Sequence, residues 1–245
     1  IMKDIPISSN SSIDSSNSPE VVSFSGDTFS FFWNEYNESN YSMYQRKIIL
    51  TETGYLPLDQ TPVVTGSKVI EYIHAESGTS LDTTVTTFYN NGYIHTYFNG
   101  DTLQFPGFPN NSLCHLSGNL FAVVYARNND YLNMRLVRIN SGGLEFADGG
   151  TPGKLDTNAL GIAGYFSNTS CAADSSGNIL IMVTRGGPDS TKYLEYILTD
   201  SSSYINYSAQ VASNISLDAA GVVNYADAPV ISYADNKFAS IFFKS

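Results

Sequence analysis

Hydrophobic and polar residues alternate at a period of two along most of the chain after residue 18, and short turns rich in Gly, Asn and Asp interrupt the alternation. Residues 19–33 show this most clearly: one alternating run leads to Gly26-Asp27, and a second run ends at Trp33. Such runs are typical of β-strands with one face in a core, and the Gly-Asp pair between them predicts a hairpin. No stretch has a sustained helical period, and only residues 209–220 leave room for a helical turn.

This strand–turn–strand unit is repeated along the chain. Residues 111–125 and 169–183 repeat it, residues 228–243 hold a final half copy, and residues 62–98 hold a weaker copy. The copies start roughly 40 to 60 residues apart, near the period of propeller repeats. A unit of about four short antiparallel strands cannot bury both of its faces alone, so neighbouring units must stack. We therefore predict an all-β fold, a β-propeller of about five four-stranded antiparallel blades with one incomplete, and keep a two-sheet sandwich as the alternative.

Each full unit continues with a polar loop and a third strand. The loops are predicted at residues 34–42, 126–130 and 185–191, and the third strands at residues 43–50, 131–139 and 192–198. Residues 1–18 are rich in Ser and Asn without periodicity, which predicts a polar N-terminal arm before a repeat domain at 19–245. Within the arm, residues 1–7 alternate like a single strand, and we expect them to complete the sheet begun by residues 228–243.

The first unit carries the phrase Pro-x-Val-x-x-x-x-Gly-Asp-x-Phe-x-x-x-Trp over residues 19–33, followed by Met43-Tyr44-Gln45-Arg46-Lys47 and Thr53-Gly54. This phrase resembles the propeller-type repeats of large bacterial extracellular and adhesin-like proteins, and similar repeats occur in phage tail and fibre components. The resemblance covers about four units and is architectural. It implies a propeller fold and a place in a larger assembly, and it carries over no functional residues.

Composition limits the partners. Charged residues make up 14 % of the chain, the formal net charge is −11, and 17 Tyr are present. Polarity supplied by uncharged side chains is typical of secreted proteins, so we expect an extracellular, cell-surface or virion-surface location. The negative charge opposes nucleic acid, and no apolar run approaches the roughly 20 residues that span a bilayer. Sequons that leave glycosylation open begin at Asn10, Asn37, Asn40, Asn110, Asn168, Asn206 and Asn214.

The two cysteines, Cys114 and Cys171, each fall in the first strand of a unit. Counting back by twos from the turn that follows each of them puts both on the same face of their strands. First strands lie side by side near the axis of a propeller, so we predict a disulfide, provided that the Cα atoms come within about 7 Å. Two buried thiols that act as small apolar residues are the alternative.

No catalytic or metal-binding pattern is found in the sequence. The three His fall in three different strands, and no zinc spacing occurs. Residues 172–177 resemble the S-x-D-x-G-x-x-W turn of sialidases, yet they lack its first Ser and its aromatic residue. We expect no cofactor, although loops at 128–130, 148–150 and 235–236 offer the oxygen ligands of calcium. Asn and Asp also favour such loops for conformational reasons.

Aromatic rings stand beside amides and charged groups in two of the predicted loop regions. The candidate ligand-binding residues are Trp33, Tyr36 and Tyr41 in the first unit, and Arg127, Asn129, Asp130 and Tyr131 in the second. Flat rings next to convergent polar groups are typical of binding sites, here for sugars. We predict a non-enzymatic binding or structural module that recognises glycans or partner proteins, including further chains of a larger assembly, through rim loops. A sialidase-like, glycan-processing propeller hydrolase is the alternative.

Overall fold

The computed structural model describes residues 15–37, 40–67, 70–79, 83–127, 131–149, 153–155, 165–186, 192–200, 230–234 and 237–240. Every regular element within these ranges is a β-strand, which confirms the all-β prediction. The same ranges hold no helix with the length and apolar character that a membrane crossing requires.

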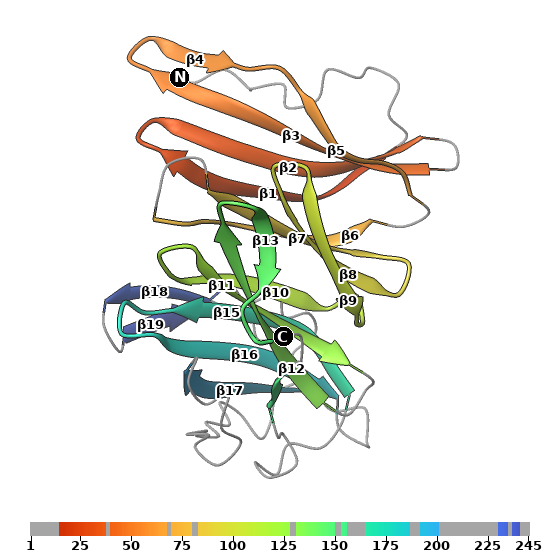
Figure 1. Cartoon of the computed structure of the whole chain (residues 1–245), viewed down its shortest axis with the longest axis vertical. Coiled ribbons are helices and arrows are strands. Elements are labelled where there is room, and N and C mark those ends of the chain that lie inside the picture. The colour runs from red at the N-terminus through yellow and green to blue at the C-terminus, as the bar shows by residue number, and fades with distance from the viewer. Residues whose placement is uncertain are drawn as a thin grey trace.

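The described strands form five antiparallel sheets that follow the order of the chain (Figure 1). The first sheet holds β1 (Ser15–Ser25), β2 (Thr28–Asn37), β3 (Asn40–Thr51), β4 (Gly54–Pro57) and β5 (Thr61–Ser67), and the second holds β6 (Glu71–Ser77), β7 (Thr84–Asn90), β8 (Tyr93–Phe98) and β9 (Asp101–Pro106). The third holds β10 (Asn111–Ser117), β11 (Leu120–Arg127), β12 (Tyr131–Asn140), β13 (Gly143–Phe146) and β14 (Gly153–Leu155). The fourth holds β15 (Tyr165–Ala173), β16 (Asn178–Gly186) and β17 (Lys192–Asp200), and the fifth holds β18 (Val230–Ala234) and β19 (Lys237–Ser240).

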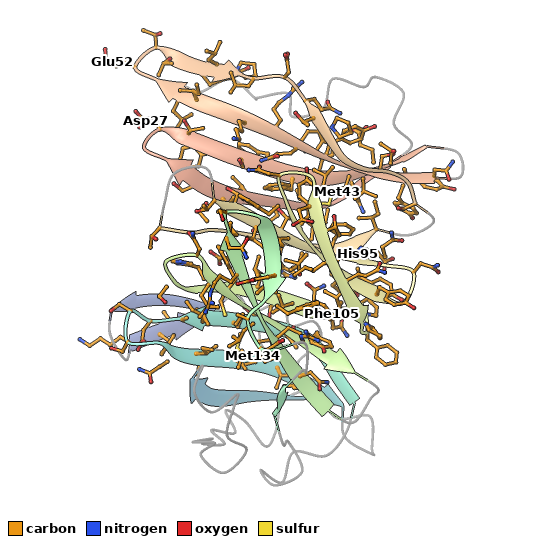
Figure 2. All side chains as sticks on the ribbon, viewed as in Figure 1. Asp27, Met43, Glu52, His95, Phe105 and Met134 are labelled. Carbon is orange, nitrogen blue, oxygen red and sulfur yellow. The ribbon has the colours of Figure 1, made fainter. Side chains whose placement is uncertain are left out.

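The sheets stack face to face, with an apolar core between each successive pair among the first four. Phe32 and Met43 of the first sheet meet Phe88 of the second. Residues that share the next two cores are Val85, Ile94, Phe105, Phe121 and Val123 between the second and third sheets, and Val124, Met134, Cys171, Ile179 and Ile181 between the third and fourth. Figure 2 shows Met43, Phe105 and Met134 among the stacked ribbons and Asp27 and Glu52 at turns outside them.

The first strands of successive sheets lie side by side, since β1 contacts β6, β6 contacts β10, β10 contacts β15, and β15 contacts β18. Those of the first three sheets also run in the same direction. The Ser77 hydroxyl donates to the Ser23 carbonyl, and the Thr79 hydroxyl donates to the Gly118 carbonyl, so β1, β6 and β10 end together. The stack therefore has two rims, one where the first strands end and one where they begin.

We call the first of these the hairpin rim; it comprises residues 25–28, 77–79, 98–101, 117–120, 140–143 and 173–178. Two of its turns are built alike. Gly26 and Gly118 have φ values of 51° and 55°, and a register shift precedes each of them. A positive φ of this size favours glycine, which explains why both turns carry it. The opposite rim, which we call the loop rim, comprises residues 36–37, 40–41, 70–72, 90–93, 106–111, 126–127 and 131.

Most strand predictions from the sequence are confirmed, with one clear correction. The third strands begin at Tyr131 and Lys192 as predicted. The polar loop predicted at residues 34–42 is wrong, because β2 continues through Asn37 and Tyr36 pairs with Tyr41 across to β3. β1 begins at Ser15, inside the stretch predicted as an arm.

Figure 1 shows the first four sheets following one another along the molecule, and the described strands do not form a closed ring. A two-sheet sandwich does not account for five successive sheets. The predicted closing strand at residues 1–7 and the helical turn expected at 209–220 both lie outside the described residues.

Candidate functional site

The loop rim carries three exposed aromatic side chains: Tyr72, Tyr93 and Phe108 are 37 %, 43 % and 42 % exposed. Tyr72 has a φ of 53°, a conformation that is uncommon for a bulky residue. Tyr93 follows the Asn91-Gly92 turn, in which both φ values are positive. Residues in sparsely populated backbone conformations cluster at functional sites, and they persist only where the surrounding structure holds them in place.

Hydrogen bonds hold the segment that carries Phe108 beside the turn before Tyr93 and beside the end of β11. The Gly107 N–H donates to the Gly92 carbonyl at 3.3 Å, and the Phe108 N–H donates to the Ala126 carbonyl at 3.0 Å. Gly107 also approaches the core closely, because a Cβ there would lie 2.7 Å from Ile94. No side chain fits at position 107, and the segment between β9 and β10 is held next to the β7–β8 turn.

Asn111 connects the second and third sheets beneath these rings. Its side chain is 1 % exposed, and Nδ2 donates to the carbonyls of Tyr72 and Pro109 at 3.2 and 3.0 Å. Its Oδ1 accepts the Thr87 hydroxyl at 2.9 Å. One buried amide therefore fixes the backbone at Tyr72 and at the loop that presents Phe108, which makes the aromatic group a preformed surface.

Two of the predicted ligand residues lie together on this rim. The rings of Tyr36 and Tyr41 face each other across β2 and β3, with centroids 4.9 Å apart, and both side chains are half-buried. Arg127 and Tyr131 pair in register at the tip of the β11–β12 hairpin, which also belongs to the loop rim. Asn129 and Asp130 lie outside the described residues.

Trp33 is placed differently from the other candidates. It is 2 % exposed, its Nε1 donates to Glu35 Oε1 at 2.8 Å, and its ring stacks on Tyr44 at 5.9 Å. A buried indole with its N–H satisfied acts as a core residue. The ring is therefore not offered to a sugar face, although its position along the sequence suggested so.

Cys114 and Cys171 lie in the same core, between the third and fourth sheets, and both are free thiols in this structure. Burial raises the pKa of the Cys114 thiol, and a hydrogen bond with Cys171 adds to this effect. The predicted closeness of the two side chains is therefore seen, whereas the disulfide itself stays a prediction.

Three titratable side chains meet where β1 contacts β6. Desolvation raises the pKa of Glu20 to about 7, and desolvation together with the charge of Glu20 raises the pKa of Glu76 to about 7. Burial lowers the pKa of His74 to about 4, and its Nδ1 lies 4.0 Å from Glu20 Oε2. The side chains of Glu20 and His74 are 32 % and 34 % exposed, so both are partly buried at this junction and still reach solvent.

The described residues contain no group of three or more His, Cys, Asp or Glu side chains arranged to hold a metal ion. Of the loops considered for calcium, 128–130 and 235–236 lie outside the description. Asp148, in the third loop, has both carboxylate oxygens bound to Arg135, at 2.7 and 3.0 Å. It serves the structure rather than an ion.

The sequence did not single out Tyr72, Tyr93 or Phe108, although Tyr93 follows the Asn91-Gly92 turn signal and Phe108 lies between Gly107 and Pro109. No family model, no curated protein and no solved structure matches this chain.

Proposed function

We propose that this chain is a non-enzymatic binding module of the β-propeller type, on an extracellular or virion surface, and that its loop rim recognises glycans or partner proteins. The observation that carries the proposal is that Tyr72, Tyr93 and Phe108 are exposed on one rim, where the buried Asn111 holds the backbone at Tyr72 and in the loop of Phe108. Single exposed apolar residues are ordinary, whereas a braced group of three aromatic rings is a candidate interaction surface.

Four features support the propeller part of the proposal. The sheets follow chain order, their first strands lie side by side, and those of the first three sheets end at a common rim. Two sheets are also built alike at the edge away from their first strand. In the first sheet β4 and β5 both pair with β3, and in the third sheet β13 and β14 both pair with β12. Radial stacking of such sheets is the propeller arrangement.

Glycans suit the loop rim because their rings present apolar C–H faces beside hydroxyl groups. The three exposed aromatic rings offer flat apolar faces, and the Tyr hydroxyls add hydrogen-bonding groups at their edges. A strongly acidic partner is less suited, because the net charge of the chain is −11. Further chains of a larger assembly are the protein partners that the repeat architecture favours.

A glycan-processing hydrolase is the alternative, and the carboxyl pair Glu20 and Glu76 is the observation in its favour. A hydrolase of this kind requires one protonated and one ionised carboxyl group, with pKa values pushed apart. Here both pKa values are raised to about 7, so the two groups are not differentiated. The binding module is therefore the better account of the geometry.

A glycan array and a panel of chromogenic glycosides, both used with the whole chain, test this proposal. We expect retention of a defined glycan group on the array and no release of chromophore. A blank array would exclude glycan recognition and leave partner proteins as the ligand class. Turnover that is lost in Glu76→Gln would contradict the non-enzymatic proposal and support the hydrolase.

A further inference from the structure

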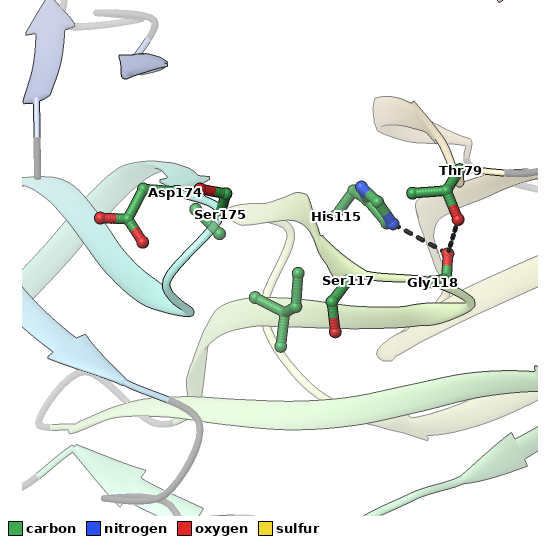
Figure 3. Close-up of a pocket in the computed structure, with 8 residues that line it drawn as sticks. Thr79, His115, Ser117, Gly118, Asp174 and Ser175 are labelled. Carbon is green, nitrogen blue, oxygen red and sulfur yellow. Dashed lines mark hydrogen bonds between the residues drawn. The ribbon is translucent and has the colours of Figure 1, made fainter. Parts of the chain in front are cut away.

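A depression of about 340 Å³ lies on the hairpin rim, where β6, β10 and β15 end (Figure 3). Residues from the second, third and fourth sheets contribute to it. It therefore lies over the neighbouring first strands β6, β10 and β15 and not on a single sheet. Its lining residues are Thr79, His115, Leu116, Ser117, Gly118, Ala173, Asp174 and Ser175. The volume is within the range of small-molecule sites, about 300–1,000 Å³.

The hydrogen-bonding state of the His115 imidazole is fixed by its neighbours. Its Nε2 lies 2.9 Å from the Gly118 carbonyl, which can only accept, so Nε2 carries the proton and donates. In the neutral ring Nδ1 is then an acceptor. The ring also rests against Phe121, with centroids 5.2 Å apart, which limits its rotation. Figure 3 shows the imidazole between Thr79 and the turn that holds Asp174 and Ser175.

Hydroxyl groups complete the polar part of the lining. The Thr79 hydroxyl donates to the same Gly118 carbonyl at 3.2 Å, so its oxygen presents lone pairs. The side chains of Ser117 and Ser175 are exposed at the edge of the depression. Leu116 and Ala173 provide apolar surface beside these groups. The depression therefore combines an imidazole acceptor, hydroxyl groups and a small apolar patch.

The one carboxylate of the lining is used by its own turn. Asp174 is 3 % exposed; its Oδ1 accepts the N–H groups of Ser176 and Asn178, and its Oδ2 accepts Asn178 Nδ2. No Lys or Arg lines the depression, so an anion would find a negative group and no cation. A wholly apolar ligand would cover the acceptor nitrogen of His115 and the lone pairs of the Thr79 oxygen without bonding them, which carries a desolvation penalty.

We propose that this depression binds one uncharged sugar residue. Sugar hydroxyls both donate and accept, which matches an imidazole acceptor beside serine and threonine hydroxyls, and a C–H face matches Leu116 and Ala173. The site is separate from the loop rim and does not depend on it. The residue is either a free monosaccharide or the terminal unit of a glycan chain, and free sugars and methyl glycosides distinguish these two sources.

Saturation-transfer NMR on the whole chain tests the proposal with glucose, galactose, mannose and N-acetylglucosamine, each as the free sugar and as the methyl glycoside, at about 10 mM. Sialic acid is the charged comparison. We expect saturation transfer to at least one uncharged probe, which should also shift the His115 imidazole nitrogen signals. Sialic acid should show no transfer and cause no shift. No transfer to any uncharged probe, or shifts confined to Tyr93 and Phe108, would overturn the proposal; the second result would still support the loop rim.

Two variants assign the binding to the depression. His115→Phe keeps the ring and removes both nitrogens, and it should weaken binding by about tenfold or more. The matched control is His95→Phe, at a histidine that stacks on Phe88 at 5.1 Å outside the depression, and it should leave binding unchanged. If His115→Phe does not fold, Thr79→Val removes one hydroxyl without changing the shape and should also weaken binding. Equal binding by the wild type and by whichever of these lining variants folds would overturn the proposal.

Discussion

Ionisation at the junction of β1 and β6 makes stability depend on pH. Glu76 has a pKa of about 7 in the folded chain against an ordinary value of 4.5. A raised pKa means that the neutral carboxyl stabilises the fold fully below about pH 4.5, and that this stabilisation is lost as the pH rises through 7. His74 acts in the opposite sense: with its pKa lowered from 6.5 to about 4, its contribution is present above pH 6.5 and lost as the pH falls through 4.

We predict that Glu76→Gln raises the melting temperature by a few degrees at pH 8 and leaves it unchanged near pH 4. The amide is neutral at both values, so it removes the cost of a desolvated carboxylate only where the wild type is ionised. The contribution of His74 is common to both proteins and cancels in the comparison.

Calorimetry of both proteins between pH 4 and pH 8 makes this measurement. Glu71→Gln is the matched control on the same strand, because the side chain of Glu71 is exposed. A Glu76→Gln effect that is the same at pH 4 and pH 8, or an equal effect in Glu71→Gln, would contradict the interpretation.

At the level of elements, a buried ion pair lies within the third sheet, and its guanidinium faces an aromatic ring of the second sheet. Arg135 on β12 binds both oxygens of Asp148, whose Oδ2 also accepts the Leu136 N–H at 3.1 Å. The guanidinium lies 3.9 Å over the ring of Phe146 and 5.6 Å from that of Phe105 on β9. The Arg135 and Asp148 side chains are 5 % and 0 % exposed, so neither charge has water to replace a lost partner.

We predict that Asp148→Asn lowers the free energy of unfolding by about 3–5 kcal/mol, because it leaves the guanidinium buried and uncompensated. Glu145→Gln is the control. It breaks the pair with Arg138, at 3.8 Å and with side chains 45 % and 52 % exposed, and should change stability by less than about 1 kcal/mol. Urea denaturation measures both. Similar losses in the two variants would show that burial does not decide the value of the pair.

The cysteines give a second test at this scale. A Cys114–Cys171 bridge would join β10 to β15 and close a loop of roughly 60 residues, which corresponds to about 4 kcal/mol of stabilisation in the chain-entropy treatment. In material secreted through an oxidising compartment, we expect neither thiol to be labelled after denaturation without reductant. Two labelled thiols would leave the pair as the buried thiols seen here and weaken the argument for that compartment.

The strands were predictable from local pattern, whereas the site was only partly so. Alternation and the Gly26 and Gly118 turns located the first hairpins, because both are properties of neighbouring residues. The end of β2 was not predictable, since the pairing of Tyr36 with Tyr41 depends on the partner strand. The exposure of side chains was the property hardest to predict. Trp33 has the same sequence signals as an exposed ring, and only packing makes it a core residue.

In the described part of the whole molecule, the third sheet, like the second, has an apolar core on each of its two faces. Adjacent residues of β11 enter different cores, Val123 toward the second sheet and Val124 toward the fourth. We predict that amides of β11 exchange with deuterium more slowly than those of β2, because opening β11 disrupts two cores at once. Exchange followed by mass spectrometry measures this. Faster exchange in β11 than in β2 would contradict the stacked arrangement.

The loop rim gives the whole molecule its proposed role, and one affinity comparison tests it most directly. The ligand is the glycan retained best on the array, and the variant is Tyr93→Ser/Phe108→Ser. The control is Leu56→Ser/Leu58→Ser, which removes two side chains of similar exposure, 53 % and 40 %, outside the loop rim. Titration calorimetry should show that the rim variant binds this glycan at least about tenfold more weakly than the wild type, and that the control binds it unchanged. Equal affinity in the rim variant and the wild type would contradict recognition through this rim.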